Sequence, residues 1–348
     1  MLVVWSHSFA LYRGSEETEP LSKLTGGVIN SGNLGVYVFF IVSGFLITQS
    51  FDRSKSASRF LGRRIARIYP GYLIAVLICG FVIIPAYTTS FVYSPKLVAK
   101  LIGLNLLLQG FFPESGAFAR NPVGAVNGSL WSISYEFWCY LGVLALGISK
   151  ATGRRGRKYT LALFVLIVCV RIWLDVSGKK PGGGIIGQII GWPYLWFKLL
   201  PCFLAGMLAY EYRDFFVRSG WLALLGVTLF LLATNLPVVL PWKLALSGFL
   251  FPPAVAYLVL YAAFAPRLID AAKYGDFSYG TYLYAFPIQQ MLRATFGVGI
   301  PFWLYIPLSI VLALSAGIVS WYGVERWFHR SNSKARQRSS SNDRITAS

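Results

Sequence analysis

The sequence predicts an all-α fold, a polytopic membrane bundle of about ten transmembrane helices, and three observations carry this prediction. Of the 348 residues, 56% are hydrophobic and only 13% are charged. Apolar runs of about 20 residues, the length that crosses a bilayer as a helix, recur along the chain. Lys and Arg residues gather mainly between these runs. Together these features exclude an ordinary soluble globular domain.

The first apolar run, 1–12, would reach only about 18 Å as a helix, which is short of the thickness of a bilayer core. We therefore expect a truncated first helix, with a chain that either starts in mid-membrane or has its true start upstream. The second run, 34–50, carries no charged residue and precedes a cationic stretch, 53–67. The remaining predicted spans are 71–87, 129–149, 159–176, 188–210, 220–238, 243–264, 278–296 and 303–324.

The stretch 97–112 is also apolar, but we predict that it is re-entrant or interfacial. If it crossed, the basic loop 150–158 would lie outside, against the tendency of Lys and Arg to stay on the cytoplasmic side. Without that crossing, most of the 32 Lys and Arg residues of the chain fall inside. This topology places both termini in the cytoplasm and suits a bacterial-type inner (plasma) membrane. We expect one membrane domain, 1–324, followed by a basic and disordered tail, 325–348.

The net charge of +19 could indicate nucleic-acid binding, but the cations lie mainly in loops and the tail, where membrane topology explains them. We therefore expect membrane lipid, and no nucleic acid, among the partners. The cysteines lie in apolar segments without a CxxC pair, so we expect buried small residues rather than disulfides or a metal site. They are Cys79, Cys139, Cys169 and Cys202. The sequence has no Walker loop, zinc spacing or GxSxG motif.

Pro and Gly residues interrupt the segment 113–128, just before the 129–149 span. Irregular backbone at membrane depth is tolerated only inside protein or beside a wet cavity, so we predict that this loop walls an outward-facing cavity. Asn127, Ser129 and Trp131 lie at its end. Rings that stack on sugar faces, beside groups that bond to hydroxyls, suit a saccharide, so these three residues are candidate substrate ligands.

Ionisable side chains inside spans are functional candidates, because burying them in a bilayer is costly. Of the 2 histidines, only His7 lies in a predicted span, which makes it the candidate general base. The alternative is a helix-packing histidine bonded to a neighbouring hydroxyl. Glu136 could orient His7, bind a substrate hydroxyl or neutralise Arg171. The alternative for Glu136 is a purely structural ion pair.

Arg64 and Arg67 are three residues apart and so share one helix face, with Arg63 adjacent. Guanidinium groups bind phosphates in a bidentate manner, which suits the nucleotide end of coenzyme A, a polyprenyl phosphate or a lipid headgroup. The alternative is an ordinary positive-inside signal.

Two further cations lie within predicted spans. Arg171 is near the outer end of its helix, from which its side chain can snorkel to the surface. Lys198 lies close to mid-span, beside Trp196 and Phe197. Either cation could counter the charge of Glu136.

Five segments, in this order along the chain, carry a resemblance to a known family. They are VVWSHS (3–8), GVYVFFIVSGFLIT (35–48), RRIARIYP (63–70), NGSLWSISYEFWCY (127–140) and SYGTYLYAFPI (278–288). The chain resembles the acyltransferase-3 family of integral-membrane O-acyltransferases, in particular the exopolysaccharide acetyltransferases, over nearly its whole length. The resemblance implies transfer of an acyl group from an acyl-CoA to a saccharide hydroxyl.

The resemblance also implies roles for single residues. His7 matches a first-helix histidine thought to be essential for acyl transfer. Arg64 and Arg67 match a cytoplasmic RxxR pair implicated in handling the acyl-CoA donor. Glu136 matches the acidic residue of the family's SLWSL–E block.

The chain departs from the family pattern at three places. A basic residue that the family carries upstream of the histidine would here precede Met1. The family often has an acidic residue where Tyr37 stands and a histidine where Ala285 stands. We expect any general role of those side chains to be absent here.

The resulting hypothesis is a membrane O-acyltransferase, in the simplest case an O-acetyltransferase. It would move an acyl group from cytoplasmic acetyl-CoA, or another acyl-CoA, to a hydroxyl of a cell-surface or exported saccharide, free or lipid-linked. His7 would act as general base or would be acylated first and relay the group. The alternative from another class is a transporter or flippase of lipid-linked saccharides without covalent chemistry. A weaker alternative is a catalytically inactive scaffold.

Overall fold

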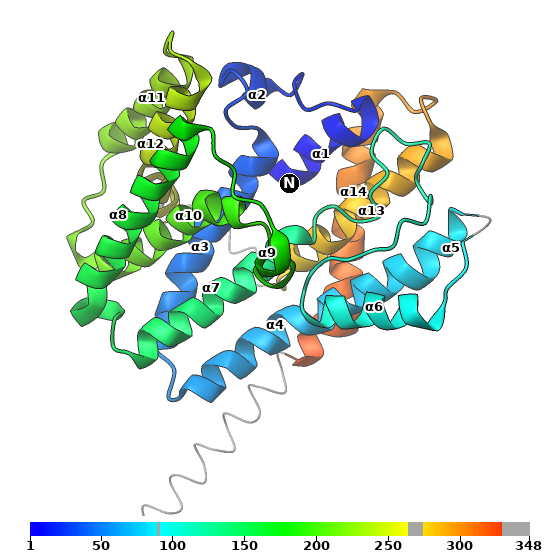
Figure 1. Ribbon diagram of the computed structural model, residues 1–348, viewed down its shortest axis with the longest axis horizontal. Coiled ribbons are helices and arrows are strands. Elements are labelled where there is room, and N and C mark those ends of the chain that lie inside the picture. The colour runs from blue at the N-terminus through cyan, green and yellow to red at the C-terminus, as the bar shows by residue number, and fades with distance from the viewer. Residues whose placement is uncertain (89–90, 264–273, 329–348) are drawn as a thin grey trace, which may run out of the picture. The chain divides into compact units, whose positions relative to one another are not determined.

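Helices form every regular element of residues 1–88, 91–263 and 274–328, the part of the chain that the computed structural model describes (Figure 1). In this part, 6 helical stretches are long and apolar enough to cross a membrane. They are Ser31–Asp52, Ala57–Ala86, Gly156–Ser177, Pro193–Glu211, Leu240–Ala263 and Phe302–Phe328. The predicted polytopic helical bundle is confirmed. The predicted tail beyond residue 328 lies outside the described residues.

The other predicted spans also form helices, but shorter or less apolar ones. They are α1 (Leu2–Arg13), α7 (Trp131–Ile148), α11 (Gly220–Asn235) and α13 (Ser278–Phe296). The stretch predicted not to cross forms α6 (Pro95–Leu106), which has 12 residues. A helix of that length reaches about 18 Å, too short to cross a bilayer core.

The helix after the cationic stretch begins earlier than predicted. We expected a span over 71–87, but α4 (Ala57–Ile78) starts within the cationic stretch. It continues through a π-helical turn, Cys79–Ile83, into α5 (Ile84–Ala86). The arginines of the RxxR pair therefore sit on the same continuous helix that enters the apolar region.

The predicted span 188–210 is broken near its start. A short helix, α9 (Gly184–Ile190), ends at Gly191, whose φ is 83°. The chain restarts as α10 (Pro193–Glu211), with proline at its first position. Proline is favoured there because the first helical residue needs no backbone N–H partner.

The described helices pack into two compact units. Unit 1 comprises Met1–Phe60, Leu107–Gln109 and Trp131–Ile269. Unit 2 comprises Leu61–Leu106, Gly110–Leu130 and Asp270–Ser348. The single membrane domain expected over 1–324 stays a prediction.

In unit 1 the backbones of α3 (Ser31–Asp52) and α10 touch at two glycines. A Cβ on Gly44 would lie 2.0 Å from the carbonyl oxygen of Phe203. A Cβ on Gly206 would lie 1.9 Å from the carbonyl oxygen of Ile41. Small residues let helices approach this closely in membranes, where packing contacts drive their association. The close approach of α10 thus explains why the VSGF segment carries a glycine, Gly44, at this position.

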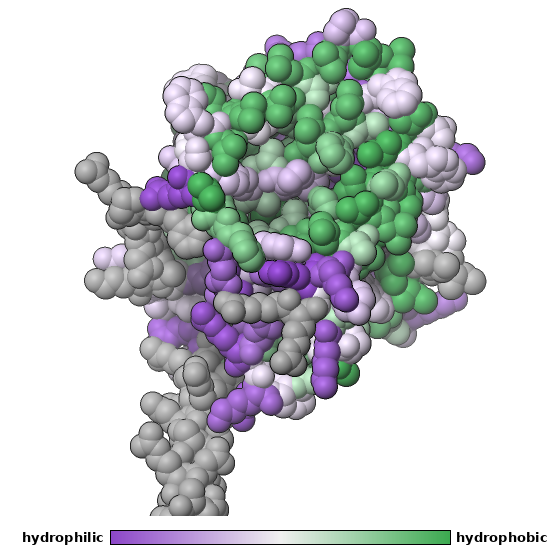
Figure 2. Space-filling model, turned by 90° about the vertical axis from the view of Figure 1, so that its left-hand side faces the viewer, coloured by the Kyte–Doolittle hydropathy of each residue, from purple (hydrophilic) through white to green (hydrophobic). Residues whose placement is uncertain are grey.

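Unit 1 also contains α2 (Pro20–Leu24), α8 (Gly153–Ser177) and α12 (Leu240–Ala263). Figure 2 shows a broad hydrophobic surface on the side where α8, α11 and α12 lie in Figure 1. Its exposed residues include Leu161, Val165 and Leu166 of α8 and Leu222, Leu224, Leu225, Leu229 and Leu232 of α11. An exposed apolar face of this extent is expected where a helix bundle meets lipid.

In unit 2 the irregular segment 113–128 is tied to α13, which packs against α14 (Phe302–Ser320). The Gln290 amide donates to the carbonyl of Val123 at 2.7 Å and to that of Ala125 at 2.6 Å. The Asn121 amide donates to Gln290 Oε1 at 2.8 Å. The predicted irregular loop is therefore present but held in place. The outward-facing cavity beside it stays a prediction.

The cysteines are all free thiols. Cys79, Cys139 and Cys202 are buried, as predicted. The prediction is wrong for Cys169, which is exposed on α8. Apolar neighbours in the sequence do not show whether a helix position faces lipid or the protein interior, because both kinds of position are hydrophobic.

Candidate functional site

His7 lies in the middle of α1 in unit 1, and its side chain is partly buried. The hydroxyls on either side of it are fully buried. Ser6 donates to Glu16 Oε1 at 3.1 Å, and Ser8 donates to the carbonyl of Val4 at 2.9 Å. These bonds tie α1 to the loop that follows it and to its own backbone, and the role of His7 stays a prediction.

Glu16, in the loop after α1, joins this helix to α3. Besides Ser6, it accepts a short hydrogen bond from the amide of Asn30, which is the N-cap of α3. Burial raises the pKa of Glu16; the bond from Ser6 opposes this rise and the charge of Glu19 adds to it. Sequence analysis missed Glu16 because it lies outside the apolar runs.

Glu19 is the second carboxylate of this junction and is fully buried. It accepts from Trp5 Nε1 at 3.2 Å, from Ser31 Oγ at 2.5 Å and from the backbone N–H of Ser22 at 2.7 Å. Burial alone would raise the pKa of Glu19, but hydrogen bonds from Ser31 and Ser22 bring it below its ordinary value. Glu16 and Glu19 together fix the helix that carries His7 against the start of α3.

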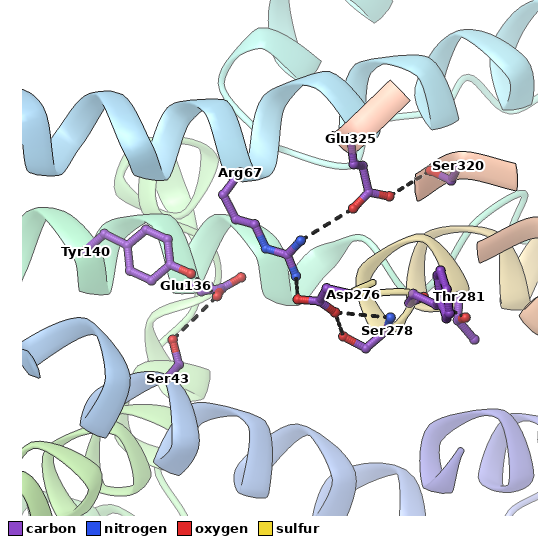
Figure 3. Close-up of polar contacts among 10 residues, drawn as sticks. Ser43, Arg67, Glu136, Tyr140, Asp276, Ser278, Thr281, Ser320 and Glu325 are labelled. Atoms are coloured by element: carbon purple, nitrogen blue, oxygen red, sulfur yellow. Dashed lines mark hydrogen bonds and ion pairs between the residues drawn. The ribbon is translucent and has the colours of Figure 1, made fainter. Parts of the chain in front are cut away.

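Glu136 is buried on α7, 6% exposed, and is held by two hydroxyls (Figure 3). Tyr140, one turn along α7, donates a short hydrogen bond to Oε1, and Ser43 of α3 donates to the same oxygen at 3.5 Å. Neighbouring residues of α3 thus have different roles. Ser43 donates a hydrogen bond to the Glu136 carboxylate, and Gly44 leaves room for the backbone of α10. The predicted role of Glu136 in orienting His7 stays a prediction.

Arg67 of unit 2 forms ion pairs with two carboxylates (Figure 3). Its Nη2 lies 2.6 Å from Asp276 Oδ2, and its Nη1 lies 3.4 Å from Glu325 Oε2. Glu325 is 2% exposed and also accepts from Ser320 Oγ at 2.8 Å. The guanidinium carbon lies 5.2 Å from the ring centroid of Tyr279. This guanidinium is therefore oriented and neutralised within its own unit.

Arg63 and Arg64 lie one turn before Arg67 on α4, and both are partly buried. Arg64 and Arg67 share a helix face, as their spacing predicts. The predicted phosphate-binding role of Arg63, Arg64 and Arg67 stays a prediction.

Asn127 and Ser129 lie together in unit 2. The Asn127 amide donates to the carbonyl of Leu283 at 2.9 Å, and its oxygen accepts from the Ser129 backbone N–H at 3.2 Å. The Ser129 carbonyl accepts from the hydroxyl of Tyr282. Asn127 is buried and ties the end of the loop to α13. The predicted role of Asn127 and Ser129 as substrate ligands stays a prediction.

Trp131 begins α7 and belongs to unit 1. It is 38% exposed, and its ring packs edge-on against Tyr135 with centroids 5.7 Å apart. Tyr135 in turn lies 4.9 Å from the ring of Trp196 and donates to the carbonyl of Trp192. The structure thus places Trp131 at one end of a row of three aromatic side chains, Trp131, Tyr135 and Trp196, which sequence analysis had not grouped.

Arg171 does not neutralise Glu136. Its Nε lies 3.4 Å from Asp175 Oδ2, one turn along α8, so this part of the prediction is corrected. Lys198 lies on α10 with its ammonium 4.9 Å from the ring centroid of Tyr194. Asp175 could have been found in the sequence, because residues four apart on a helix are neighbours.

The geometry therefore places a partly buried histidine and a buried carboxylate in unit 1 and a cationic helix in unit 2. A sequence model described as an acyltransferase domain matches residues 1–322. The chain belongs to the acyltransferase-3 family. It is a membrane acyltransferase, an enzyme that transfers groups other than aminoacyl groups.

Three relatives illustrate this acyltransferase-3 membership. An O-acetyl transferase of Shigella phage Sf6 is 28% identical over 336 residues, 94% of this chain and 92% of that protein. Nodulation protein 10 of Rhizobium leguminosarum bv. viciae is 27% identical over 317 residues, 84% of this chain and 81% of that protein. Acyltransferase MdmB of Streptomyces mycarofaciens is 36% identical over 110 residues, 32% and 27% of the two chains. No solved structure matches.

The two departures from the acyltransferase-3 pattern inside the chain lie in packed surroundings. The Tyr37 ring contacts Phe251 edge-on, with centroids 5.3 Å apart. Ala285 is 2% exposed on α13. These positions are filled by packing side chains rather than by an acid and a histidine. Among the described residues, no group of three or more His, Cys, Asp and Glu side chains could hold a metal ion.

Proposed function

We propose that this membrane acyltransferase transfers an acetyl group from cytoplasmic acetyl-CoA, or another acyl group from its acyl-CoA, to a hydroxyl of an exported or cell-surface saccharide. The observation that carries the proposal is the nearly full-length similarity to a phage protein named O-acetyl transferase. The family model over residues 1–322 agrees with it. The aromatic row of Trp131, Tyr135 and Trp196 is of the kind that stacks on sugar rings.

The proposed reaction uses His7 at the acceptor hydroxyl. A neutral imidazole takes the hydroxyl proton while the oxygen attacks the thioester carbonyl, and the sulfur of coenzyme A leaves and takes up a proton. A positioned general base contributes roughly 10²–10⁴-fold in rate. The alternative is a relay, in which His7 first takes the acyl group and then passes it to the hydroxyl. Both routes consume one acyl-CoA for each ester formed.

Glu136 and the arginines have supporting roles in the proposal. Glu136 binds the acceptor or orients His7, and Tyr140 and Ser43 hold its carboxylate. Arg63 and Arg64 bind the phosphates of the acyl-CoA. Arg67 is held by Asp276 and Glu325, so its proposed contribution is a fixed guanidinium that supports the donor site rather than a mobile phosphate ligand.

The test is acetyl transfer in isolated membranes that contain the full chain. Membranes are supplied with acetyl-CoA labelled in the acetyl group, and label is measured in the saccharide fraction together with release of free coenzyme A. The proposal predicts ester-linked label, removable by mild base, and an equal amount of coenzyme A. Saccharide movement across the membrane without consumption of acetyl-CoA would contradict it. Membranes without the protein are the control.

A further inference from the structure

A group of charged side chains lies in unit 1 on α8 and α10, apart from the residues given roles above. The two helices are labelled in Figure 1. Arg171 and Asp175 sit one turn apart on α8 and are 8% and 5% exposed. Tyr194 and Lys198 sit one turn apart on α10. A Cβ on Gly248 of α12 would lie 2.6 Å from Arg171 Nε, so the glycine makes room for the guanidinium.

The carboxylate of this group is already used by its neighbours. Asp175 Oδ2 accepts from Arg171 Nε at 3.4 Å, and Asp175 Oδ1 accepts from the Tyr194 hydroxyl at 2.9 Å. Among the described residues, the Nε bond is the guanidinium's sole hydrogen bond. The two terminal nitrogens of a buried arginine are thus left for a ligand or for water.

Lys198 has no carboxylate within ion-pair distance among the residues that the structure describes. Its ammonium lies over the Tyr194 ring and is subject to the charges of Arg171, Asp175 and Lys180. Lys180 is exposed in the loop after α8. Arg171 and Lys198 therefore have one carboxylate, Asp175, between them, and Lys180 adds a third positive charge from the exposed loop after α8.

An excess of positive charge inside an apolar bundle is costly unless an anion or water compensates it. The ring of Tyr194 compensates Lys198 only in part. Snorkelling could bring Lys198 to the surface, since it is one to two turns from the start of α10. It does not account for Arg171, which stays buried against Gly248 of α12.

Aromatic rings connect this group to the surroundings of Glu136. Tyr135, next to Glu136 in the chain, contacts the ring of Trp196, two residues before Lys198. Trp192 contacts Tyr194, with ring centroids 6.0 Å apart, and is 45% exposed. Exposed rings beside a cationic site are suited to a sugar that carries a negative charge.

We propose that Arg171, Lys198 and Lys180 bind an anionic group, a phosphate or a carboxylate, carried by the saccharide acceptor. This inference rests on the proposed function and narrows it, because it makes the acceptor an acidic saccharide or a saccharide phosphate. The anion bonds to the terminal nitrogens of Arg171 and to the ammonium of Lys198. The exposed Lys180 attracts it to the site.

The test measures binding without acetyl-CoA, using the full chain in nanodiscs of phosphatidylcholine. The probes are glucose 6-phosphate, glucuronic acid, glucose and inorganic phosphate, each titrated calorimetrically. We expect one of the two acidic sugars to bind at least ten times more tightly than glucose and than inorganic phosphate. Lys198→Met should weaken that binding by about 10- to 100-fold, the range for loss of a hydrogen bond to a charged group.

Matched variants distinguish loss of a ligand-binding side chain from loss of the folded structure. Lys198→Arg should bind within about threefold of the wild type, because it keeps the charge. Lys243→Met on α12 removes a lysine from the same unit but outside the group and should bind like the wild type. If Lys198→Met does not fold, Lys180→Met in the exposed loop replaces it, and binding should weaken several-fold.

Other results would overturn the inference. Binding of no probe, or equal binding by the wild type and Lys198→Met, means that the cations are solvated and hold no anion. Inorganic phosphate that binds as tightly as the acidic sugars overturns the assignment to the acceptor. So does loss of sugar binding in nanodiscs of phosphatidylglycerol, which would place a lipid headgroup at the site. Because acetyl-CoA is absent, these failures leave the proposed acyl transfer untouched.

Discussion

Arg67 Nη2 lies 2.6 Å from the carboxylate of Asp276. With Glu325 as a second partner, a guanidinium that the sequence assigns to the acyl-CoA donor is fixed by two acids of its own unit. The environments of these acids differ, because the Asp276 side chain is 46% exposed and that of Glu325 is 2% exposed. The buried acid should therefore matter more than the exposed one, although its contact is longer.

Replacement of the two acids tests this difference. Glu325→Gln removes a charged hydrogen-bond partner of Arg67 from a buried position and should lower the free energy of unfolding by about 1.5–3 kcal/mol. Asp276→Asn removes a largely solvated partner and should cost about 0.2–1 kcal/mol. Thermal unfolding in detergent micelles measures both. A larger loss from Asp276→Asn than from Glu325→Gln would contradict the role given to Glu325.

The contact between α3 and α10 predicts strong sensitivity to a single methyl group. Gly44→Ala would place a carbon 2.0 Å from a carbonyl oxygen of α10, so the helices must separate. Overpacking of this kind costs about 1–3 kcal/mol or more. Gly142→Ala on α7 is the matched control, because nothing lies within 4 Å of its Cβ position. Equal unfolding temperatures for the two variants would show that α3 and α10 are not in contact.

Glu16 predicts a pH dependence of stability at the junction of α1 and α3. Its pKa is raised by burial from an ordinary value of 4.5, so the folded state holds a proton that the unfolded state has released. Stability is therefore lost as the pH rises above 4.5 through the raised pKa. Glu16→Gln removes this loss, so its stability relative to the wild type should increase over that range.

Unfolding by denaturant at a series of pH values measures the Glu16 effect. A constant offset between the two proteins reports only altered hydrogen bonds, since the slope with pH is the signature of titration. Glu19→Gln should show the opposite slope, because the pKa of Glu19 is lowered and its contribution is lost as the pH falls. Parallel curves for wild type and Glu16→Gln would contradict the pKa rise.

The partners of Glu136 should differ in their effect on acyl transfer. Tyr140 makes a short bond to the carboxylate and Ser43 a long one of 3.5 Å. Loss of a hydrogen bond to a charged group costs about 1.5–3 kcal/mol, which corresponds to a factor of roughly 10 to 100 in a rate or equilibrium constant. Tyr140→Phe should therefore lower kcat/KM by that factor. Ser43→Ala should lower it less. Normal activity of Tyr140→Phe would remove Glu136 from the proposed machinery.

Much of the fold follows from the sequence, because hydrophobic runs of membrane-spanning length can be recognised without knowledge of their neighbours. The break before α10 was missed although Gly191 and Pro193 are visible signals of a helix end. The partners of Arg67 could not be predicted, since they lie 209 and 258 residues further along the chain. Periodicity shows which face of a helix is apolar, but not which helix packs against it.

The candidate residues divide in the same way, into those that the sequence alone indicates and those that only the folded structure reveals. His7 and Glu136 could be singled out because an ionisable group in an apolar span is conspicuous. Glu16, Glu19, Asp276 and Glu325 sit at the ends of apolar segments, where a carboxylate is commonplace. Their importance comes from hydrogen bonds that exist only in the folded chain.

The most direct test of the account is acetyl transfer by His7→Ala compared with His329→Ala. The two substitutions are chemically identical, and His329 lies in the tail beyond the described residues. Membranes with equal amounts of each protein are given labelled acetyl-CoA, and label in saccharide is counted. We predict that His329→Ala keeps wild-type transfer and that His7→Ala loses it, by at least the roughly 10²–10⁴-fold contribution of a general base. Near-normal transfer by His7→Ala would contradict the central role of this histidine.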